Sequence, residues 1–279
     1  MTDPGWDPAT LSASADDAEA MHRLAVITGL GRGVPHDPKL AMSYLGRAAD
    51  LGHTVANRTR AILEAEPGGL DEWLRPAPAQ LVSERPRVLS ADRFVSDAVC
   101  DWLVECARGG DLKPATIYDE VTGKAQINPI RTNSTFFFNL ARTDLVVVLV
   151  REKLARLAGL PTSGLEASQI LHYLPGQQFD WHVDFLHPDA PGHRLDLGSR
   201  GQRIATALVR LNDDYEGGET VFKTGDQRFR GPKGSVVMWT NVTPDGLPDP
   251  ESRHAGLPPT SGEKWVLSQW MRPHAPLWS

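Results

Sequence analysis

The sequence of 279 residues is 41% hydrophobic and contains 22 prolines and 25 glycines, which fits one large domain, or a large and a small domain, with many turns. A formal net charge of −6 without a long basic run argues against a nucleic-acid-binding protein, and the presence of only two cysteines, Cys100 and Cys106, argues against a disulfide framework or a cysteine-based zinc site. Because the opening residues lack the features of a signal peptide and no apolar stretch approaches the roughly 20 residues that span a bilayer, we expect a cytoplasmic protein with no membrane partner.

A tail at residues 1–17 precedes a segment, residues 18–66, that is rich in Ala, Leu, Arg and Glu and is predicted to be helical. Asp37 is expected to cap a helix that begins at Pro38, and Gly52 to end it before a further helix. The pattern "GRGVPHD…A…YLGRAADLGH…A" resembles one unit of a Sel1-type repeat, a relative of tetratricopeptide arrays. An ordinary helical hairpin is the alternative, and either would be an interaction or buttressing element.

The stretch at residues 67–85 contains several prolines and glycines and is predicted to be a linker. Two helices are expected after it, one in "SADRFVSDAVCDWLVECAR" with Ser96 or Asp97 as its cap, and one in "LVVVLVREKLARLAGL". From residue 166 onwards short strands alternate with turn clusters such as "DDYEGG". Many short strands favour a sandwich or jelly roll over a parallel sheet.

One of these strands carries an unusual pair of polar residues. In "HYLPGQQFDWHVDF" the apolar residues at 179, 181, 183 and 185 alternate with Asp180, His182 and Asp184. This alternation predicts a strand with one apolar face and one polar face. The pair His182 and Asp184 indicates either a wet surface or two ligands aimed at one point. A second copy of the same spacing, at His187 and Asp189, lies in a proline-containing loop and is interpreted as a decoy.

Further along the chain the sequence offers a third ligand and a cation. Two histidines and one carboxylate form the facial triad that holds ferrous iron and leaves other positions open, and His254 is the candidate for the missing histidine. Ten residues later, Lys264 opens a strand on which Lys264, Val266, Ser268 and Trp270 share a face. A lysine pointing into an apolar barrel is costly unless it meets an anion.

The stretch from about residue 86 to 273 resembles the prolyl 4-hydroxylase group of Fe(II)/2-oxoglutarate dioxygenases. The matching pieces occur in family order: "RTN" (131–133), "HYLPGQQFDWHVDF", "GQRIATALVRLNDDYEGGETVFK", "PKGSVVMW" and "SRHAGLPPTSGEKWVLSQW". The resemblance implies a mainly β fold, a double-stranded β-helix or jelly roll of the cupin type with flanking helices, in residues 86–274, followed by a short tail at residues 275–279.

The resemblance also implies a role for particular residues. His182, Asp184 and His254 would bind iron, and Lys264 would pair with the far carboxylate of 2-oxoglutarate. Hydroxyls for the same carboxylate would come from Tyr173 and Thr220, and pocket or substrate positions would be held by Arg203, Trp270 and Arg131. The alternatives are a core role for Tyr173, a simple strand position for Thr220, packing for Trp270 and a surface salt bridge for Arg131; His172, His187 and His193 are unassigned.

The implied activity is hydroxylation of an unactivated C–H bond, with Fe(II), 2-oxoglutarate and O2, and with a need for ascorbate left open. A prolyl residue in a peptide or protein is the favoured substrate; another side chain or a free amino acid is the alternative. A zinc hydrolase has no use for Lys264, and a protein-binding module with a degenerate barrel does not explain an intact triad. Two features put the substrate in doubt, namely Lys223 where the family often has proline and the loop 186–201, which we expect to be a mobile lid. The sequence leaves the oligomeric state open.

Overall fold

The computed structural model describes residues 6–14 and 16–273. The chain divides into two compact units, one made of Met1–Pro76 with Asn139–Leu157 and the other of Ala77–Phe138 with Ala158–Ser279. No helix within the described residues is long and apolar enough to cross a membrane.

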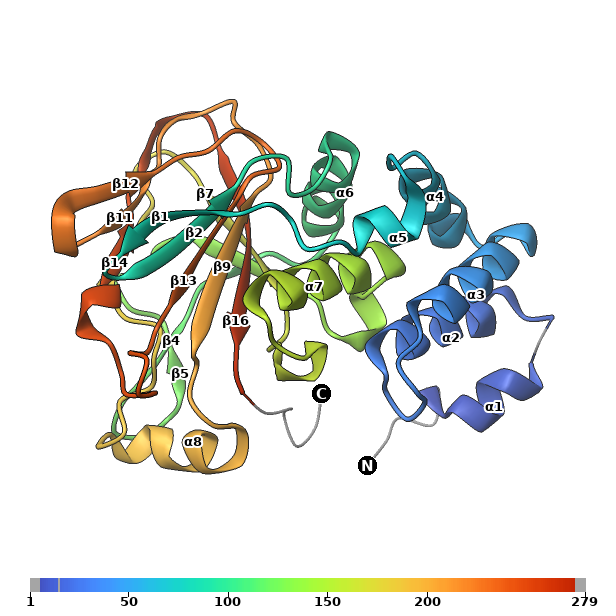
Figure 1. Ribbon diagram of the computed structural model, residues 1–279, viewed down its shortest axis with the longest axis horizontal. Coiled ribbons are helices and arrows are strands. Elements are labelled where there is room, and N and C mark those ends of the chain that lie inside the picture. Colours follow the sequence, from blue (N-terminus) through green and yellow to red (C-terminus); the bar gives the residue numbers. More distant parts are fainter. Residues whose placement is uncertain (1–5, 15, 274–279) are drawn as a thin grey trace. The chain divides into compact units, whose positions relative to one another are not determined.

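The first unit is helical. Its helices are α1 (Pro8–Ala13), α2 (Ala18–Leu30), α3 (Pro38–Asp50), α4 (Thr54–Glu64), α5 (Gly69–Trp73), the 3-10 turn η2 (Leu140–Arg142) and α7 (Leu145–Ala158) (Figure 1). Asp37 caps α3 as predicted, because its carboxylate accepts from the backbone N–H groups of Lys39 at 3.0 Å and Leu40 at 2.9 Å. Helix α2 ends at Gly31, whose φ of 67° is the left-handed conformation typical of a glycine after a helix.

Helix α7 belongs to this helical unit, although the sequence places its residues inside the domain 86–274. The reason is its valine-rich stretch: every residue from 145 to 150 is buried. Gly29 of α2 lets the two helices approach, since a Cβ atom there would lie 2.7 Å from Val148 Cγ1. The predicted linker 67–85 is also partly ordered, because it contains α5 and a first strand, and the buried Trp73 indole donates to the carbonyl of Leu149 at 3.2 Å.

The second unit consists mostly of strands. Its strands are β1 (Gln80–Glu84), β2 (Arg87–Ala91), β3 (Lys113–Pro114), β4 (Ile117–Tyr118), β5 (Ala125–Gln126), β6 (Ser134–Phe137), β7 (Gln169–Tyr173), β8 (Phe179–His182), β9 (Ala205–Arg210), β10 (Glu216–Gly217), β11 (Thr220–Phe222), β12 (Gln227–Phe229), β13 (Val236–Thr240), β14 (His254–Gly256), β15 (Pro259–Ser261) and β16 (Lys264–Met271). Its helices are α6 (Asp97–Arg108) and α8 (Arg194–Arg200), with 3-10 turns η3 (Thr162–Gly164), η4 (Pro191–His193), η5 (Thr224–Asp226) and η6 (Pro250–Ser252). Ser96, rather than Asp97, caps α6.

Two antiparallel sheets form the framework of this unit. The larger has the order β1-β2-β13-β9-β16-β7-β6-β3 and the smaller the order β12-β11-β14-β8. In Figure 1 the long strands β9, β13 and β16 run side by side, as their ladders require. The mainly β architecture with flanking helices agrees with the prediction.

The strand parity of the larger sheet decides which side chains face inward. On β16 the four residues Lys264, Val266, Ser268 and Trp270 all line one internal cavity, which confirms the predicted face. On the neighbouring strand β9, Thr206 and Leu208 line the same cavity, while Ala207 and Val209 are buried on the other side. Polar groups of two adjacent strands therefore converge inside the barrel.

The loop at residues 186–201 contains η4 and α8 and is hydrogen-bonded to other segments of the same unit. Asp196 of α8 accepts from Arg272 Nη2 at 2.8 Å, and Gly192 donates to the carbonyl of Glu120 at 2.8 Å. Its predicted mobility without a ligand stays a prediction.

Candidate metal centre

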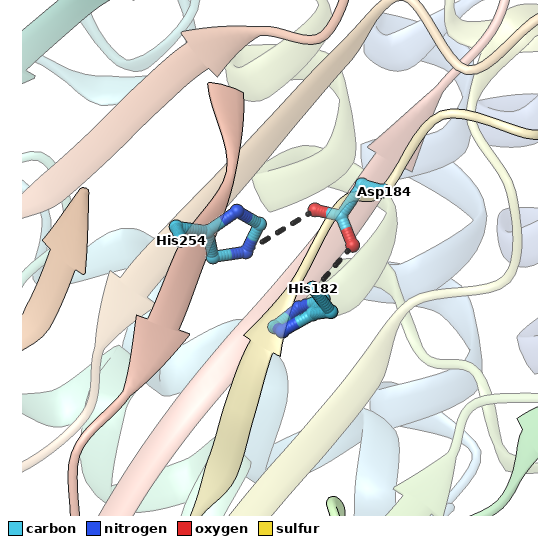
Figure 2. A group of neighbouring side chains, drawn as sticks. All are labelled: His182, Asp184 and His254. Carbon is cyan, nitrogen blue, oxygen red and sulfur yellow. Dashed lines mark ion pairs between the residues drawn. The ribbon is translucent and has the colours of Figure 1, made fainter. Parts of the chain in front are cut away.

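His182, Asp184 and His254 come together at one end of the smaller sheet. His182 is the last residue of β8 and His254 the first of β14, and the two are paired in the β8/β14 ladder. Asp184 follows two residues after β8, and its carboxylate oxygens lie 3.7 Å from His182 Nε2 and 3.6 Å from His254 Nε2 (Figure 2). The structure thus brings together the three ligands predicted from the sequence.

A β-bulge in β8 sets the direction of His182. The ladder pairs His254 with His182 and Gly256 with Phe179, so three steps on β8 face two steps on β14. Phe179 and His182 consequently both line the cavity, and their rings stack with centroids 3.4 Å apart. The strict alternation predicted for residues 179–185 is therefore wrong, and the strand ends at His182.

Both histidines are held in the tautomer that presents Nε2 to the centre. His182 Nδ1 lies 2.7 Å from the carbonyl oxygen of Asp180, and His254 Nδ1 lies 2.9 Å from that of Ser252. A carbonyl only accepts, so each Nδ1 carries a proton, and Nε2 is the nitrogen left to bind a metal. The Nε2 atoms of both imidazoles therefore face the same point.

The carboxylate of Asp184 is oriented by a chain of hydrogen bonds from Thr206 of β9 and from Asn241, the residue after β13. Thr206 Oγ1 donates to Asp184 Oδ2 at 2.7 Å, and the side-chain amide of Asn241 donates to Thr206 Oγ1 at 2.8 Å. Burial opposes ionisation of Asp184, but the neighbouring His254 and His182 and the Thr206 hydroxyl outweigh it and lower the pKa of the carboxyl. Burial, together with the nearby His254, lowers the pKa of His182 to about 3. These directions favour an ionised Asp184 beside a neutral His182 imidazole, the forms that bind a metal.

This donor set fits a divalent transition metal. The candidate ligand atoms all lie within 4.8 Å of one another, and metal–ligand bonds of about 2.1 Å put adjacent ligand atoms roughly 3 to 3.5 Å apart. Two imidazoles and one carboxylate are the ligands that hold ferrous iron on one face. The side chains around them are apolar and rigid: Phe179 stacks on His182, and the Trp239 ring lies 4.6 Å from that of His254.

The triad faces a cavity that encloses about 440 Å³ of space, part of it open to solvent. The residues that line it come from both sheets and are Arg131, Leu171, Tyr173, Phe179, His182, Asp184, Thr206, Leu208, Thr220, Trp239, His254, Gly256, Lys264, Val266, Ser268 and Trp270. The volume suits a small molecule, and its walls combine apolar side chains with polar and charged groups.

Lys264 supplies a buried cation in this cavity. Its side chain is 3% exposed, and its Nζ lies 4.7 Å from the centroid of the Tyr173 ring. Burial and the charge of Arg210 lower the pKa of Lys264 to about 7, with a small opposing contribution from Glu219. Gly256 leaves room in front of this ammonium, because a Cβ there would lie 3.5 Å from the Tyr173 hydroxyl and 4.0 Å from Lys264 Nζ.

The other predicted site residues are distributed as follows. Thr220, Trp270 and Arg131 line the cavity, and the Arg131 guanidinium lies 4.5 Å from the centroid of the Phe179 ring. Arg131 is 5% exposed, so the alternative role considered for it from the sequence, a surface salt bridge, does not apply. Arg203 is not among the described residues that line the cavity.

Arg203 instead belongs to a buried ionic network. Its Nε lies 2.7 Å and its Nη2 3.0 Å from the two oxygens of Glu166, and its guanidinium stacks 3.6 Å from the centroid of the Trp270 ring. Arg272 also binds Glu166, at 2.6 Å, and then Asp196. Arg203 therefore touches the cavity only through Trp270.

The remaining histidines lie outside the triad. His172 stacks on Trp265 and lies 3.1 Å from Glu263, which is a structural role, as expected from its strand parity. His187, in the second His-x-Asp copy, lies 3.5 Å from Glu120 and is not part of the candidate metal cluster found among the described residues.

Sequence reasoning missed several residues of the site. Thr206 and Asn241 orient Asp184, and Phe179 and Trp239 enclose the histidines. Phe179, Thr206 and Trp239 lie within the quoted motifs but were given no role there, and Asn241 lies outside them. The available signal was the alternation of β9, because Thr206 in "RIATALVRLN" is one of the inward-facing residues of that strand.

Comparisons with known proteins agree with this geometry. Residues 168–272 match the model of the 2OG-Fe(II) oxygenase superfamily. Prolyl 4-hydroxylase 2 of Arabidopsis thaliana is 30% identical over 219 residues, covering 71% of this chain and 71% of that protein. Probable prolyl 4-hydroxylase 6 of the same plant is 34% identical over 214 residues and covers 70% and 72%.

The solved structures lead to the same group. The viral collagen prolyl hydroxylase of Paramecium Bursaria Chlorella virus-1, in complex with 2OG, is similar with a TM-score of 0.50 and 25% identity over 66% of this chain and 95% of that one. These similarities confirm the double-stranded β-helix core and the cofactors predicted from the sequence. The chain therefore belongs to the prolyl 4-hydroxylase-like 2OG-Fe(II) oxygenases and is a dioxygenase that depends on Fe(II), 2-oxoglutarate and O2.

Proposed function

We propose that this dioxygenase hydroxylates a prolyl residue in a peptide or protein. The observation that carries the proposal is a single cavity with the His182, Asp184 and His254 cluster on its wall and the buried Lys264 facing the same space. The similarity to prolyl 4-hydroxylases supports the choice of substrate class.

The chain's own residues have distinct tasks in this reaction. His182, Asp184 and His254 hold the iron, and bound iron with 2-oxoglutarate supplies the chemistry that couples O2 to C–H hydroxylation and releases succinate and carbon dioxide. Lys264 binds the far carboxylate of 2-oxoglutarate, and the hydroxyls of Tyr173 and Thr220 orient it. Burial raises the pKa of Tyr173 to about 12, which keeps its hydroxyl as a donor toward that carboxylate.

The apolar residues of the cavity exclude water from the reacting atoms. Leu171, Leu208, Val266 and the rings of Phe179 and Trp239 surround the space between Lys264 and the triad. A dry site strengthens the ion pair at Lys264 and protects the reaction from competing water.

Arg131 and Trp270 are the proposed contacts for the substrate. Both line the cavity, and the Arg131 guanidinium is already held by the carbonyl of Thr116 at 3.0 Å, so it is fixed in place before substrate binds. Arg203 acts as a positioning residue for Trp270, because its guanidinium stacks on the indole and is anchored by Glu166.

The helical residues 18–66 are proposed to be a Sel1-like unit that serves protein recognition. Helices α2 and α3, and then α3 and α4, form successive helical pairs, as such a repeat requires. Removing the first 66 residues is expected to impair hydroxylation of a protein substrate more than 2-oxoglutarate binding. A truncated protein that hydroxylates the same substrates at full rate would contradict this role.

The decisive experiment is mass spectrometry of proline-containing peptides incubated with the protein, Fe(II) and 2-oxoglutarate. The expected result is the gain of one oxygen atom on a prolyl residue, with an equal amount of succinate, and neither without 2-oxoglutarate or in Asp184→Ala. Oxygen on a different side chain, or on a free amino acid only, would show that the proposed substrate is wrong.

A further inference from the structure

A second buried cation lies next to Lys264 on the inner face of the larger sheet. Arg210 is the last residue of β9 and shares the parity of Thr206 and Leu208, which line the cavity; Arg210 and Tyr215 are not themselves among the described lining residues and lie beyond Lys264. In the β9/β16 ladder Arg210 is paired with Val266, so it is the diagonal neighbour of Lys264 on the same face. Such neighbours lie within reach of each other when their side chains are long.

A tyrosine and a glycine complete this corner of the barrel. The Arg210 guanidinium lies 5.1 Å from the centroid of the Tyr215 ring. At Gly218, a Cβ would lie 2.8 Å from Tyr215 Cε2 and 3.2 Å from Lys264 Cδ, so the ring and the lysine stem flank the same glycine. Arg210, Tyr215 and Lys264 therefore form one compact group.

The polar ends of Arg210 and Tyr215 are not fully satisfied within the described part of the protein. Arg210 Nη1 and the Tyr215 hydroxyl are buried and lack a partner of good hydrogen-bond geometry, although the two side chains interact with each other. No described carboxylate lies within ion-pair distance of Arg210 or Lys264; Asp213 and Glu219 act on them only from further away. Two cations kept out of water without a counter-charge are costly, which points to an anion that arrives from outside the chain.

The two charges are also electrostatically coupled. The guanidinium of Arg210 contributes, after burial, to the lowered pKa of Lys264. The positive potential of Arg210 disfavours protonation of the Lys264 amine. The same potential favours a carboxylate placed beside both groups.

We propose that Arg210 is a second cation for the distal carboxylate of 2-oxoglutarate, and that the Tyr215 hydroxyl helps to orient it. The inference rests on the proposed role of Lys264 at the same carboxylate. It assigns to Arg210 a part in selecting a dicarboxylate over 2-oxo acids that lack the second acidic group, because only a dicarboxylate neutralises both cations.

The test is to measure binding of 2-oxoglutarate and of 2-oxopentanoate to the full-length protein loaded with Mn(II), by titration calorimetry without turnover. 2-Oxopentanoate carries a methyl group in place of the distal carboxylate. Arg210→Met is expected to weaken 2-oxoglutarate binding by about tenfold or more, as loss of a charge-assisted contact does, and to leave 2-oxopentanoate binding unchanged. Arg210→Lys should restore most of the affinity, and Tyr215→Phe should weaken it by a smaller factor.

Arg230→Gln is the matched control. Arg230 lies 5.3 Å from the centroid of the same Tyr215 ring but is partly exposed and paired with Glu216, so its loss should change the affinity less than twofold. The proposal is overturned if Arg210→Met binds 2-oxoglutarate normally, if both 2-oxo acids lose affinity equally, or if Arg230→Gln has the same effect. Lys264→Met separates the proposed role of Lys264 from that of Arg210. Normal 2-oxoglutarate binding in Lys264→Met overturns the role of Lys264 itself. Weaker binding in Lys264→Met with normal binding in Arg210→Met overturns only the role of Arg210.

Discussion

Lys264 and Tyr173 are direct partners in the β7/β16 ladder, and the lysine ammonium lies 4.7 Å from the centroid of the tyrosine ring inside the cavity. A cation over a ring face gains some electrostatic stabilisation, but less than an ion pair would give. The pair therefore leaves the ammonium available to a carboxylate ligand.

The affinity for 2-oxoglutarate is expected to fall as the pH rises above about 7. Burial and Arg210 lower the pKa of Lys264 to about 7 in the free protein, against the opposing effect of Glu219, whereas a bound carboxylate raises it again. Below pH 7 the lysine is protonated in both states, so its protonation contributes no pH dependence. Above pH 7 binding takes up a proton, and the dissociation constant should rise about tenfold per pH unit until the pKa of the complex is reached.

Titration calorimetry of the Mn(II)-loaded protein from pH 6.5 to 9 measures this dependence. Lys264→Arg is the control, because arginine stays charged over that range and its affinity should be nearly independent of pH. An affinity of the original protein that is equally flat would exclude the lysine as the titrating group.

Asp184→Ala should abolish metal binding, while Asp189→Ala should retain it. Asp184 lies between the two histidine Nε2 atoms, whereas the loop that contains Asp189 is held through His187 and Glu120, away from the described triad. Equilibrium dialysis against Fe(II) or Mn(II) measures the difference. Equal loss of metal in both aspartate variants would contradict the assignment.

Thr206→Val should weaken metal binding without removing a ligand. The substitution keeps the shape of the side chain but deletes the hydroxyl that donates to Asp184 Oδ2 at 2.7 Å. Residues that orient ligands in this way are worth about 10- to 100-fold in metal affinity. Thr206→Ser keeps the hydroxyl and should bind metal almost normally; if both variants lose affinity alike, packing of the methyl group is the cause.

Gly256→Val should block 2-oxoglutarate while leaving the metal site intact. The Cβ position faces the Tyr173 hydroxyl and Lys264 Nζ, so the methyl groups of valine would fill the space in front of the ammonium. Gly256→Ala adds only the Cβ and should cost much less affinity. Metal binding and 2-oxoglutarate binding are measured separately on both variants. Loss of both in Gly256→Val would indicate misfolding of β14 and contradict the prediction.

The parts of the site that the sequence predicted are those encoded by short motifs and strand parity. His182, Asp184 and His254 stand in a specific spacing, and the alternation around Lys264 placed its strand face correctly. The bulge at Asp180 and Trp181 escaped prediction, because it depends on the register against β14, a strand more than 70 residues away along the chain.

Non-local partners account for the other differences. Arg203 has no local signal for its partner Glu166, which lies 37 residues before it and also binds Arg272. Helix α7 was correctly predicted as a helix. The compact unit to which it belongs depends on the residues that pack against its valines, and these include Gly29 of α2.

The Glu166 network gives a last prediction, on stability and its pH dependence. Burial opposes ionisation of Glu166, but Arg203 and Arg272 outweigh it and lower the pKa to about 2. Because this pKa is depressed in the folded state, the stabilisation is complete above the ordinary pKa of about 4.5 and is lost as the pH falls toward 2. Glu166→Gln keeps the size of the side chain but leaves two buried guanidinium groups short of a counter-charge, so we expect a loss of about 3–5 kcal/mol in the free energy of unfolding at pH 7. Urea unfolding of the metal-free protein between pH 3 and 7 measures both effects: the original protein should lose stability toward acid more steeply than Glu166→Gln. Asp196→Asn removes the more exposed partner of Arg272 and the half-buried partner of Arg200, and should cost much less. Equal unfolding midpoints for the original protein and Glu166→Gln at pH 7 would show that the two arginines do not depend on this carboxylate.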